Sequence, residues 1–247
     1  MRRGAIICTL ILLAVPALAG DVVTVAVASN FSRTAGELSA RFAGETGVTV
    51  RISNGSTGKL YAQILNGAPF DVFLAADAER PALLEQAGRT VPGSRFTFAI
   101  GSLVLWSRDA EDCRAALHDN GAGRIALANP ATAPYGRAAA EFLAREGLRE
   151  SMSKRAVYGE NIGQAMQFVA TGNARLGIIA KSQLSAPKLP DAACTWDVPT
   201  SSHSRLEQQA VLLVRAADSE NARRFYDWLR SADARAIIAR HGYEVMP

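Results

Sequence analysis

The chain has 247 residues, of which 49% are hydrophobic, and its 27 Lys and Arg against 23 Asp and Glu give a formal net charge of +4. A charge this small, with no block of basic residues interleaved with aromatic ones, argues against a nucleic-acid-binding protein. A chain of this length and apolar content can bury a substantial core in one domain or two.

Residues 1–19 predict a secretion signal. Two arginines precede an apolar run, and this run ends in the sequence Ala-Leu-Ala, which is typical of a cleavage site. The run is too short to span a membrane as a helix. We therefore expect an exported protein whose signal is cleaved near Ala19.

Two cysteines, Cys113 and Cys194, remain after the signal is removed. In an oxidising, exported setting an even pair favours a disulfide. The alternative is two buried thiols.

Strand and helix patterns alternate from the start of the mature chain. Val22–Ser29 is an almost continuous apolar run, as expected of a parallel strand covered on both faces. A helix ending at Gly44, a β-branched strand at 48–52, a helix from Lys59 and a short strand at 70–74 follow. This order predicts a doubly wound α/β sheet.

The second half of the chain repeats this rhythm. The strand-rich segment 95–106 carries Gly101 in its middle, and we interpret it as a first crossing between two lobes. Three more strands follow, at 125–128, 156–158 and 176–180. A strand at 207–214 is interpreted as the second crossing, and the tail is helical.

The predicted architecture is therefore two α/β lobes joined by a hinge of two crossings. Each lobe contains a doubly wound mixed sheet flanked by helices. Lobe 1 is expected to comprise 20–101 plus 209–247, and lobe 2 to comprise 102–208.

Four polar turns lie where a strand ends and a helix starts, near residues 29–32, 54–58, 129–136 and 159–163. In α/β folds such turns share the carboxyl edge of the sheet, where ligands bind. Helix N-termini offer unpaired N–H groups and a positive dipole end, which suits an oxyanion. Each turn alone is ambiguous, since Ser, Thr and Asn cap helices everywhere.

Other chemistry has little support in the sequence. The three His show no metal-ligand spacing, and neither a nucleophile elbow nor a zinc-protease motif occurs. We expect no catalytic residues, no cofactor and no direct ligands of a metal cation.

Six runs, taken in order, resemble the periplasmic molybdate-binding proteins of ABC-type importers, which are type II periplasmic binding proteins. They are VAVASNF, GSTGKLYAQILNGAPFDVF, PGSRFTFAIGSLVLWS, NPATAPYG, NIGQA and HGY. The resemblance covers essentially the whole mature chain. It implies a monomeric periplasmic protein that captures molybdate or tungstate and passes it to a membrane permease.

The resemblance also implies a set of anion-binding residues. The two hydroxyl sites fall on Ser29 with Asn30 and on Thr57 with Ser56 beside it, and the backbone donors fall on Tyr135 and Ile162. Asn161 is a secondary candidate, like Ser56. Some members use a Tyr hydroxyl where this chain has Ala180, so Asn30 and Tyr135 are expected to replace it.

Three alternatives remain open at this stage. Sulfate differs from molybdate mainly in size, which a sequence does not give, so another oxyanion is one alternative. A secreted hydrolase would need a base beside one of the turn hydroxyls. A binder of organic solutes would need a charged partner, and the turns offer only Lys59 and Glu160. A donor-only site favours a fully deprotonated anion over hydrogen phosphate, which needs an acceptor.

Overall fold

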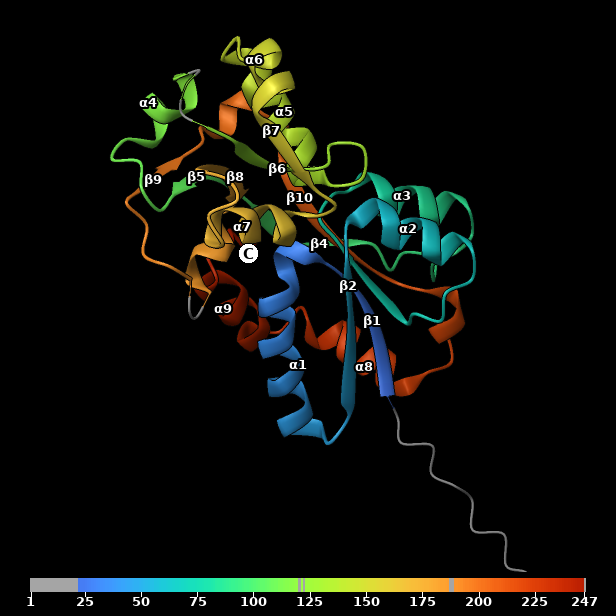
Figure 1. The fold of residues 1–247 in the computed structure, drawn as a ribbon. Helices are drawn as coiled ribbons and strands as arrows, with labels where there is room; N and C mark the ends of the chain where they lie inside the picture. Colours follow the sequence, from blue (N-terminus) through green and yellow to red (C-terminus); the bar gives the residue numbers. More distant parts are fainter. Residues whose placement is uncertain (1–21, 120, 122, 187–188, 247) are drawn as a thin grey trace, which may run out of the picture.

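The computed structural model describes residues 22–119, 121, 123–186 and 189–246, which form two α/β lobes lying against each other (Figure 1). The predicted signal at 1–19 lies outside the described residues. Each lobe is built on a five-stranded mixed sheet. The predicted fold class is therefore confirmed.

The first sheet combines strands from both ends of the chain. It contains β1 (Val22–Ala28), β2 (Thr49–Gly55), β3 (Val72–Ala75), β4 (Phe96–Gly101) and β10 (Leu206–Leu212). The order across the sheet is β2-β1-β3-β10-β4. β1 is parallel to β2 and β3, whereas β10 is antiparallel to β3 and β4.

Helices cover both faces of this sheet. One face carries α1 (Ser32–Thr46), α8 (Glu220–Trp228) and α9 (Ala232–Arg240), and the other carries α2 (Thr57–Leu65) and α3 (Glu79–Gln86). Val25 and Val27 of β1 belong to the first of these cores, and Ala26 belongs to the second. Because side chains alternate across a strand, a strand buried on both faces reads as an unbroken apolar run.

The second sheet repeats the arrangement of the first. It contains β5 (Leu103–Ser107), β6 (Ile125–Ala128), β7 (Ala156–Gly159), β8 (Leu176–Ala180) and β9 (Cys194–Asp197). The order is β7-β6-β8-β5-β9. β6 is parallel to β7 and β8, and β5 is antiparallel to β8 and β9.

Four α-helices accompany the second sheet in the described part of the chain. They are α4 (Cys113–His118), α5 (Pro134–Arg145), α6 (Arg149–Arg155) and α7 (Ile162–Ala170). A disulfide between Cys113 and Cys194 joins the start of α4 to β9 across a separation of 81 residues. Within the described ranges, no helix combines the length and the apolar character needed to cross a membrane.

Short 3-10 turns connect several of these elements. They are η1 (Ser29–Phe31), η2 (Lys181–Ser185), η3 (Thr200–Ser202) and η4 (Val214–Ala216). η1 leads from β1 into α1, and η2 leaves β8. Both therefore lie at the ends of central strands, on the side where the two lobes meet.

The chain crosses between the lobes twice. At the first crossing the predicted long strand is divided into β4, which ends at Gly101, and β5, which begins after Ser102 and belongs to the other sheet. The second crossing differs from the prediction. β10 lies wholly in the first sheet from Leu206 onward, so the segment 198–205 makes the passage from β9. The apolar pattern identified a strand but could not tell which sheet would pair with it.

Candidate functional site

A small cavity lies between the lobes and brings together residues from four separate turns. Its lining comprises Ala28, Ser29, Asn30, Gly55, Ser56, Thr57, Ala76, Ala133, Pro134, Tyr135 and Ile162. The volume that the centre of a water molecule can reach in this cavity is about 10 Å³, which is close to the minimum needed to hold one water. In this arrangement of the lobes the cavity is therefore too small for an organic solute.

The cavity lies where helices begin. Ser29 and Asn30 open η1, Thr57 opens α2, Tyr135 is in the first turn of α5, and Ile162 opens α7. The first N–H groups of a helix have no partner within it, and the dipole is positive at that end. Four such starts converging on one cavity make a neutral surface that favours an anion.

Ser56 and Thr57 differ in how their hydroxyls are used. Thr57 is buried, and its Oγ1 accepts a hydrogen bond of 3.1 Å from the N–H of Ala76. Ser56 is also buried, but its Oγ has no hydrogen-bond partner among the described residues. A buried hydroxyl without a partner is costly. Ser56 lines the cavity, so its hydroxyl is free to donate to a group there.

Asn30 is buried, and its side chain is already engaged. The amide Nδ2 donates to Gln208 Oε1 at 2.8 Å and to Tyr243 Oη at 3.0 Å. Both N–H groups of the amide are thereby used. The N–H that Asn30 can offer to the cavity is therefore that of its main chain.

The side chain of Tyr135 is likewise held in place by a hydrogen bond within the protein. Its phenol accepts a hydrogen bond of 3.2 Å from Gln208 Nε2. A Cβ on Gly101 would lie 2.0 Å from the same phenol oxygen, so the ring requires glycine at the first crossing. Burial raises the pKa of the Tyr135 phenol well above its usual 10.0, and burial raises the pKa of Tyr243 to about 12. Neither phenol carries a negative charge near the cavity at neutral pH.

Asn161 and Ile162 have separate roles at the start of α7. The Asn161 side chain accepts from the N–H of Gln164 at 3.1 Å and caps the helix. Asn161 does not belong to the cavity lining, unlike the other six predicted anion-binding residues. The carbonyl of Ile162 accepts from Gln183 Nε2 at 3.2 Å, which fixes the helix start against η2.

The two lobes touch around the cavity. The N–H of Gly58 in α2 donates to the carbonyl of Thr132 at 2.9 Å. Two ion pairs add to this contact, Lys59–Glu160 at 2.7 Å and Arg137–Glu79 at 2.7 Å. The two charged residues that the turns supply thus pair with each other across the lobes. Among the described residues that line the cavity, none is charged.

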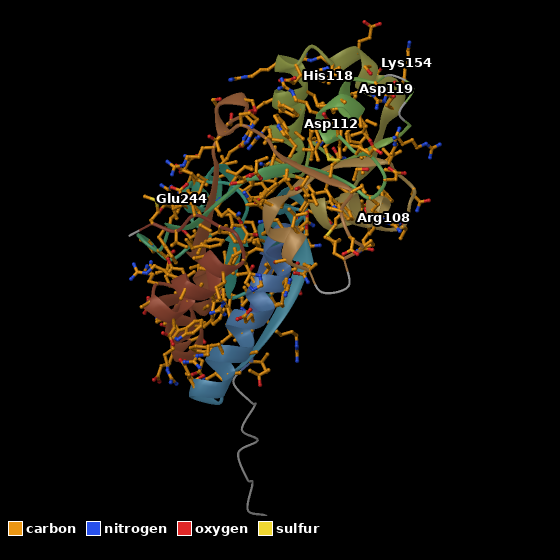
Figure 2. The ribbon with its side chains drawn as sticks, turned by 90° about the vertical axis from the view of Figure 1, so that its left-hand side faces the viewer. Arg108, Asp112, His118, Asp119, Lys154 and Glu244 are labelled. Carbon is orange, nitrogen blue, oxygen red and sulfur yellow. A yellow bond between two sulfur atoms is a disulfide. The ribbon has the colours of Figure 1, made fainter. Side chains whose placement is uncertain are left out.

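In the described part of the chain, no three His, Cys, Asp or Glu side chains lie close enough together to hold a metal ion. Figure 2 shows Asp112, His118 and Asp119 together in the second lobe. Asp112 caps α4, and His118 pairs with Glu146 at 3.1 Å. These residues have structural partners, and none of them lines the cavity.

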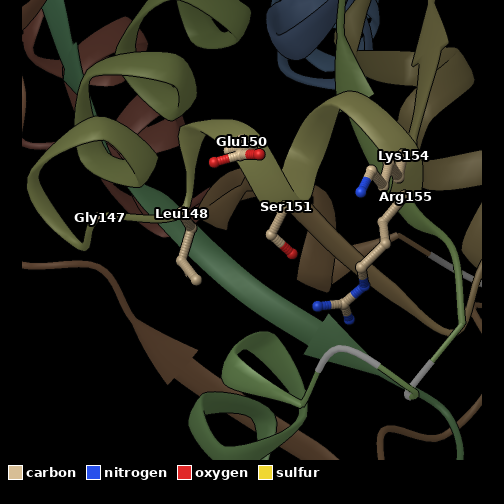
Figure 3. A pocket seen from close by; sticks show the side chains of 6 residues that line it. All are labelled: Gly147, Leu148, Glu150, Ser151, Lys154 and Arg155. Carbon is tan, nitrogen blue, oxygen red and sulfur yellow. The ribbon is translucent and has the colours of Figure 1, made fainter.

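A larger hollow, of about 460 Å³, follows α6 on the second lobe and is lined by Gly147, Leu148, Glu150, Ser151, Lys154 and Arg155 (Figure 3). The buried Arg155 donates to three main-chain carbonyls, those of Ala116, Leu117 and Gly123. Its guanidinium therefore anchors α6 to the end of α4. These hydrogen bonds account for the buried Arg155 guanidinium, and none of the predicted anion-binding residues lines the hollow.

Gln208 is the residue of this region that the sequence did not single out. It lies in an apolar strand and is fully buried, yet it contacts both Asn30 and Tyr135. The signal available in the sequence was its amide at the second position of the run EQQAVLLV, since a buried polar side chain requires partners.

The chain matches the family described as "Bacterial extracellular solute-binding protein" over residues 23–244. It is 42% identical over 246 residues to the molybdate-binding protein ModA of Rhodobacter capsulatus, covering 98% of this chain and 96% of that protein. It is 44% identical over 235 residues to ModA of Azotobacter vinelandii, covering 94% and 93%. The solved periplasmic molybdate-binding protein of Azotobacter vinelandii superposes with a TM-score of 0.86 at 39% identity, covering 91% of this chain and 100% of that chain.

Proposed function

The chain belongs to the bacterial extracellular solute-binding protein family, and we propose that it captures molybdate between its lobes and delivers it to an ABC importer. Two relatives that match almost its whole length at 42% and 44% identity are molybdate-binding proteins. The protein is a periplasmic binding protein and not an enzyme. Removal of residues 1–19 near Ala19, action as a monomer and the absence of nucleic-acid binding are parts of the same proposal.

The observation that carries the proposal is the unpaired Ser56 hydroxyl in a cavity without charged lining among the described residues. A dianion without a proton needs donors only, and helix N-termini with hydroxyls supply them. Neutral donors are sufficient because water is excluded and the donors are fixed before the ligand arrives. Closure of the lobes over the ligand is the motion that this site requires.

Six residues are proposed to hold the anion, by two kinds of donor. Hydroxyl groups donate from Ser29, Ser56 and Thr57. Main-chain N–H groups donate from Asn30, Tyr135 and Ile162. This set keeps the primary residues that the resemblance implied and leaves out the secondary candidate Asn161, which does not line the cavity. It assigns the main-chain N–H to Asn30 and raises Ser56 to a primary donor, because its hydroxyl has no other partner among the described residues.

Selectivity follows from the same donor set. Hydrogen phosphate carries a proton that needs an acceptor, and no carboxylate belongs to the described lining. Tungstate has the charge and nearly the size of molybdate, so we expect it to bind as well. Sulfate differs in size alone and is the alternative ligand. A hydrolase would require a His, Asp or Glu beside a lining hydroxyl, and the described lining holds none.

The lobes themselves are proposed as 20–101 plus 209–247 for lobe 1 and 102–208 for lobe 2. Strand pairing supports this division, with one adjustment. β10 enters the first sheet at Leu206, so the second boundary fits best just before that residue.

Titration calorimetry of the mature, ligand-free protein tests the function. We expect tight one-to-one binding of molybdate and tungstate, with weak or no binding of sulfate and phosphate. A preference for sulfate would keep the site and change the ligand. Failure to bind all four anions would refute an oxyanion site.

A further inference from the structure

Gln208 sits between the cavity and the strands that join the lobes. It belongs to β10, and its side chain is fully buried. Its Oε1 accepts from Asn30 Nδ2 at 2.8 Å, and its Nε2 donates to Tyr135 Oη at 3.2 Å. Asn30 belongs to the first lobe and Tyr135 to the second. One amide therefore links two lining residues that stand on opposite sides of the cavity.

The first-lobe end of this link is fixed by further bonds. Tyr243 Oη accepts from Asn30 Nδ2 at 3.0 Å and donates back to the Asn30 carbonyl at 2.9 Å. Ser182 Oγ of the second lobe donates to the same carbonyl at 3.3 Å. Since both amide hydrogens of Asn30 are used, its side chain serves as a support for its main chain rather than as a ligand.

The second-lobe end of this link, at Tyr135, is fixed by close packing. The Tyr135 phenol lies so close to Gly101 that a Cβ there would come within 2.0 Å of its oxygen and 2.9 Å of Gln208 Nε2. The phenol can occupy this position only when the first turn of α5, which carries Tyr135, packs against Gly101 at the first crossing. The bond from Gln208 to Tyr135 thus joins the two lobes, whereas the bond to Asn30 stays within the first lobe.

We propose that Gln208 is a positioning residue that couples anion binding to lobe closure, through its hydrogen bonds to Asn30 of the first lobe and Tyr135 of the second. The inference rests on the proposed function. Closing the lobes removes the Gln208 and Tyr135 side chains from water, and their mutual bond replaces the water that they lose. Without it, closure leaves a buried donor and a buried phenol unpaired, and the competent state is less populated.

The chain contains a matched control in the next residue. Gln209 lies on the same strand and is also buried, but its side chain bonds to Thr97 and Arg95, within the first lobe. Gln208→Leu removes the hydrogen bonds that link the lobes. Gln209→Leu removes a glutamine of similar burial and leaves those hydrogen bonds intact.

The experiment measures molybdate affinity by calorimetry for the wild type, Gln208→Leu and Gln209→Leu. The wild type should bind tightly, Gln208→Leu should bind roughly 10- to 100-fold more weakly, and Gln209→Leu should stay within about threefold of the wild type. Small-angle scattering should show that molybdate compacts Gln208→Leu less than it compacts the other two proteins. A wild type that does not bind molybdate would refute the function, whereas tight binding by both variants, or equal losses in both, would refute the role of Gln208 alone.

A double-mutant cycle separates positioning from general support. Tyr135→Phe removes the phenol hydroxyl, which is the acceptor of the link, and should weaken binding about 3- to 10-fold. If Gln208 acts through the phenol, the double variant should bind within about threefold of Gln208→Leu. Independent, multiplying losses would overturn the coupling. Should Gln208→Leu fail to fold, Tyr135→Phe still decides, because unchanged binding in that variant contradicts the proposal.

Discussion

The main-chain N–H of Ala76 donates to the hydroxyl of Thr57 over 3.1 Å, with both residues buried beside the cavity. The hydroxyl carries one hydrogen, and its oxygen is the acceptor in this bond. The Thr57 hydrogen therefore remains available for a group in the cavity. Ala76 ends the β3 region, so the neighbouring strand fixes the orientation of this donor before any anion arrives.

Replacing Thr57 by Ala should weaken molybdate binding by about 1–3 kcal/mol, the cost of losing a buried hydrogen bond to a charged group. The substitution also leaves the Ala76 N–H without its acceptor, so the free protein should lose stability. Thr57→Ser keeps the hydroxyl and should retain most of the affinity. Calorimetry on both variants checks this, and equal binding by Thr57→Ala and the wild type would remove Thr57 from the site.

Ser56→Ala gives a cleaner test, because the Ser56 hydroxyl has no partner in the part of the chain that the structure describes. Binding should weaken by about 1–3 kcal/mol, while the ligand-free protein should be as stable as the wild type or slightly more stable. Thermal melting without and with molybdate measures both quantities. A loss of stability without a loss of affinity would show that the hydroxyl serves the fold instead.

Gly101→Ala should prevent the closed arrangement, because the new Cβ would meet the Tyr135 phenol oxygen at 2.0 Å. We expect affinity to fall by at least about tenfold, since binding must then favour a strained or more open state. Gly36→Ala in α1 is the control, since no described atom beyond the adjacent helix backbone lies within 4 Å of its added Cβ and a helix favours Ala over Gly. Comparable affinities for the two variants would show that the phenol can move aside.

The buried phenols predict an alkaline loss of stability. Burial raises the pKa of Tyr243 from 10.0 to about 12 and that of Tyr135 well above 10.0. The unfolded chain releases these protons near pH 10 while the folded chain keeps them. The stabilising effect is therefore complete below pH 10 and is lost as pH rises through 12. Urea unfolding at several pH values measures the slope, which should be smaller in Tyr243→Phe; an identical slope in that variant would contradict this assignment.

The ion pair between Lys59 and Glu160 joins the lobes beside the cavity at 2.7 Å, but both side chains are largely exposed. Glu160→Gln should therefore weaken binding by only about 0.2–1 kcal/mol at low salt. The difference from the wild type should disappear near 1 M salt, where charges are screened within about 3 Å. Asp227→Asn, which breaks an exposed pair inside the first lobe, is the control. A salt-independent loss in Glu160→Gln would point to a contact other than this pair.

The arrangement of the site could be foreseen where it depends on local pattern and topology. Ser29, Ser56 and Thr57 follow parallel strands, so a shared sheet edge brings them together. The same reasoning placed the starts of α5 and α7 opposite them. Asn161 shows the limit of this inference, because an Asn before a helix is equally a cap, and here it acts as one.

The supporting contacts were not predictable in the same way. Asn30 pairs with Gln208 across 178 residues and with Tyr243 across 213 residues, and no sequence period relates such positions. Short elements were missed as well. β9 has four residues within a polar, proline-bearing stretch, and its pairing with β5 decides its conformation.

The position of β10 has a consequence for how the polypeptide is assembled. β10 lies between β3 and β4, although it is made after every strand of the second sheet. As the chain emerges, the second lobe can complete its pairing while β3 waits with an open edge, which is the condition that favours aggregation. A nascent chain that ends before Leu206 would contain a complete second sheet and an incomplete first sheet. The strands from the N-terminal half of the protein therefore depend on β10, which is synthesised last of all the strands in the described chain, to complete their sheet.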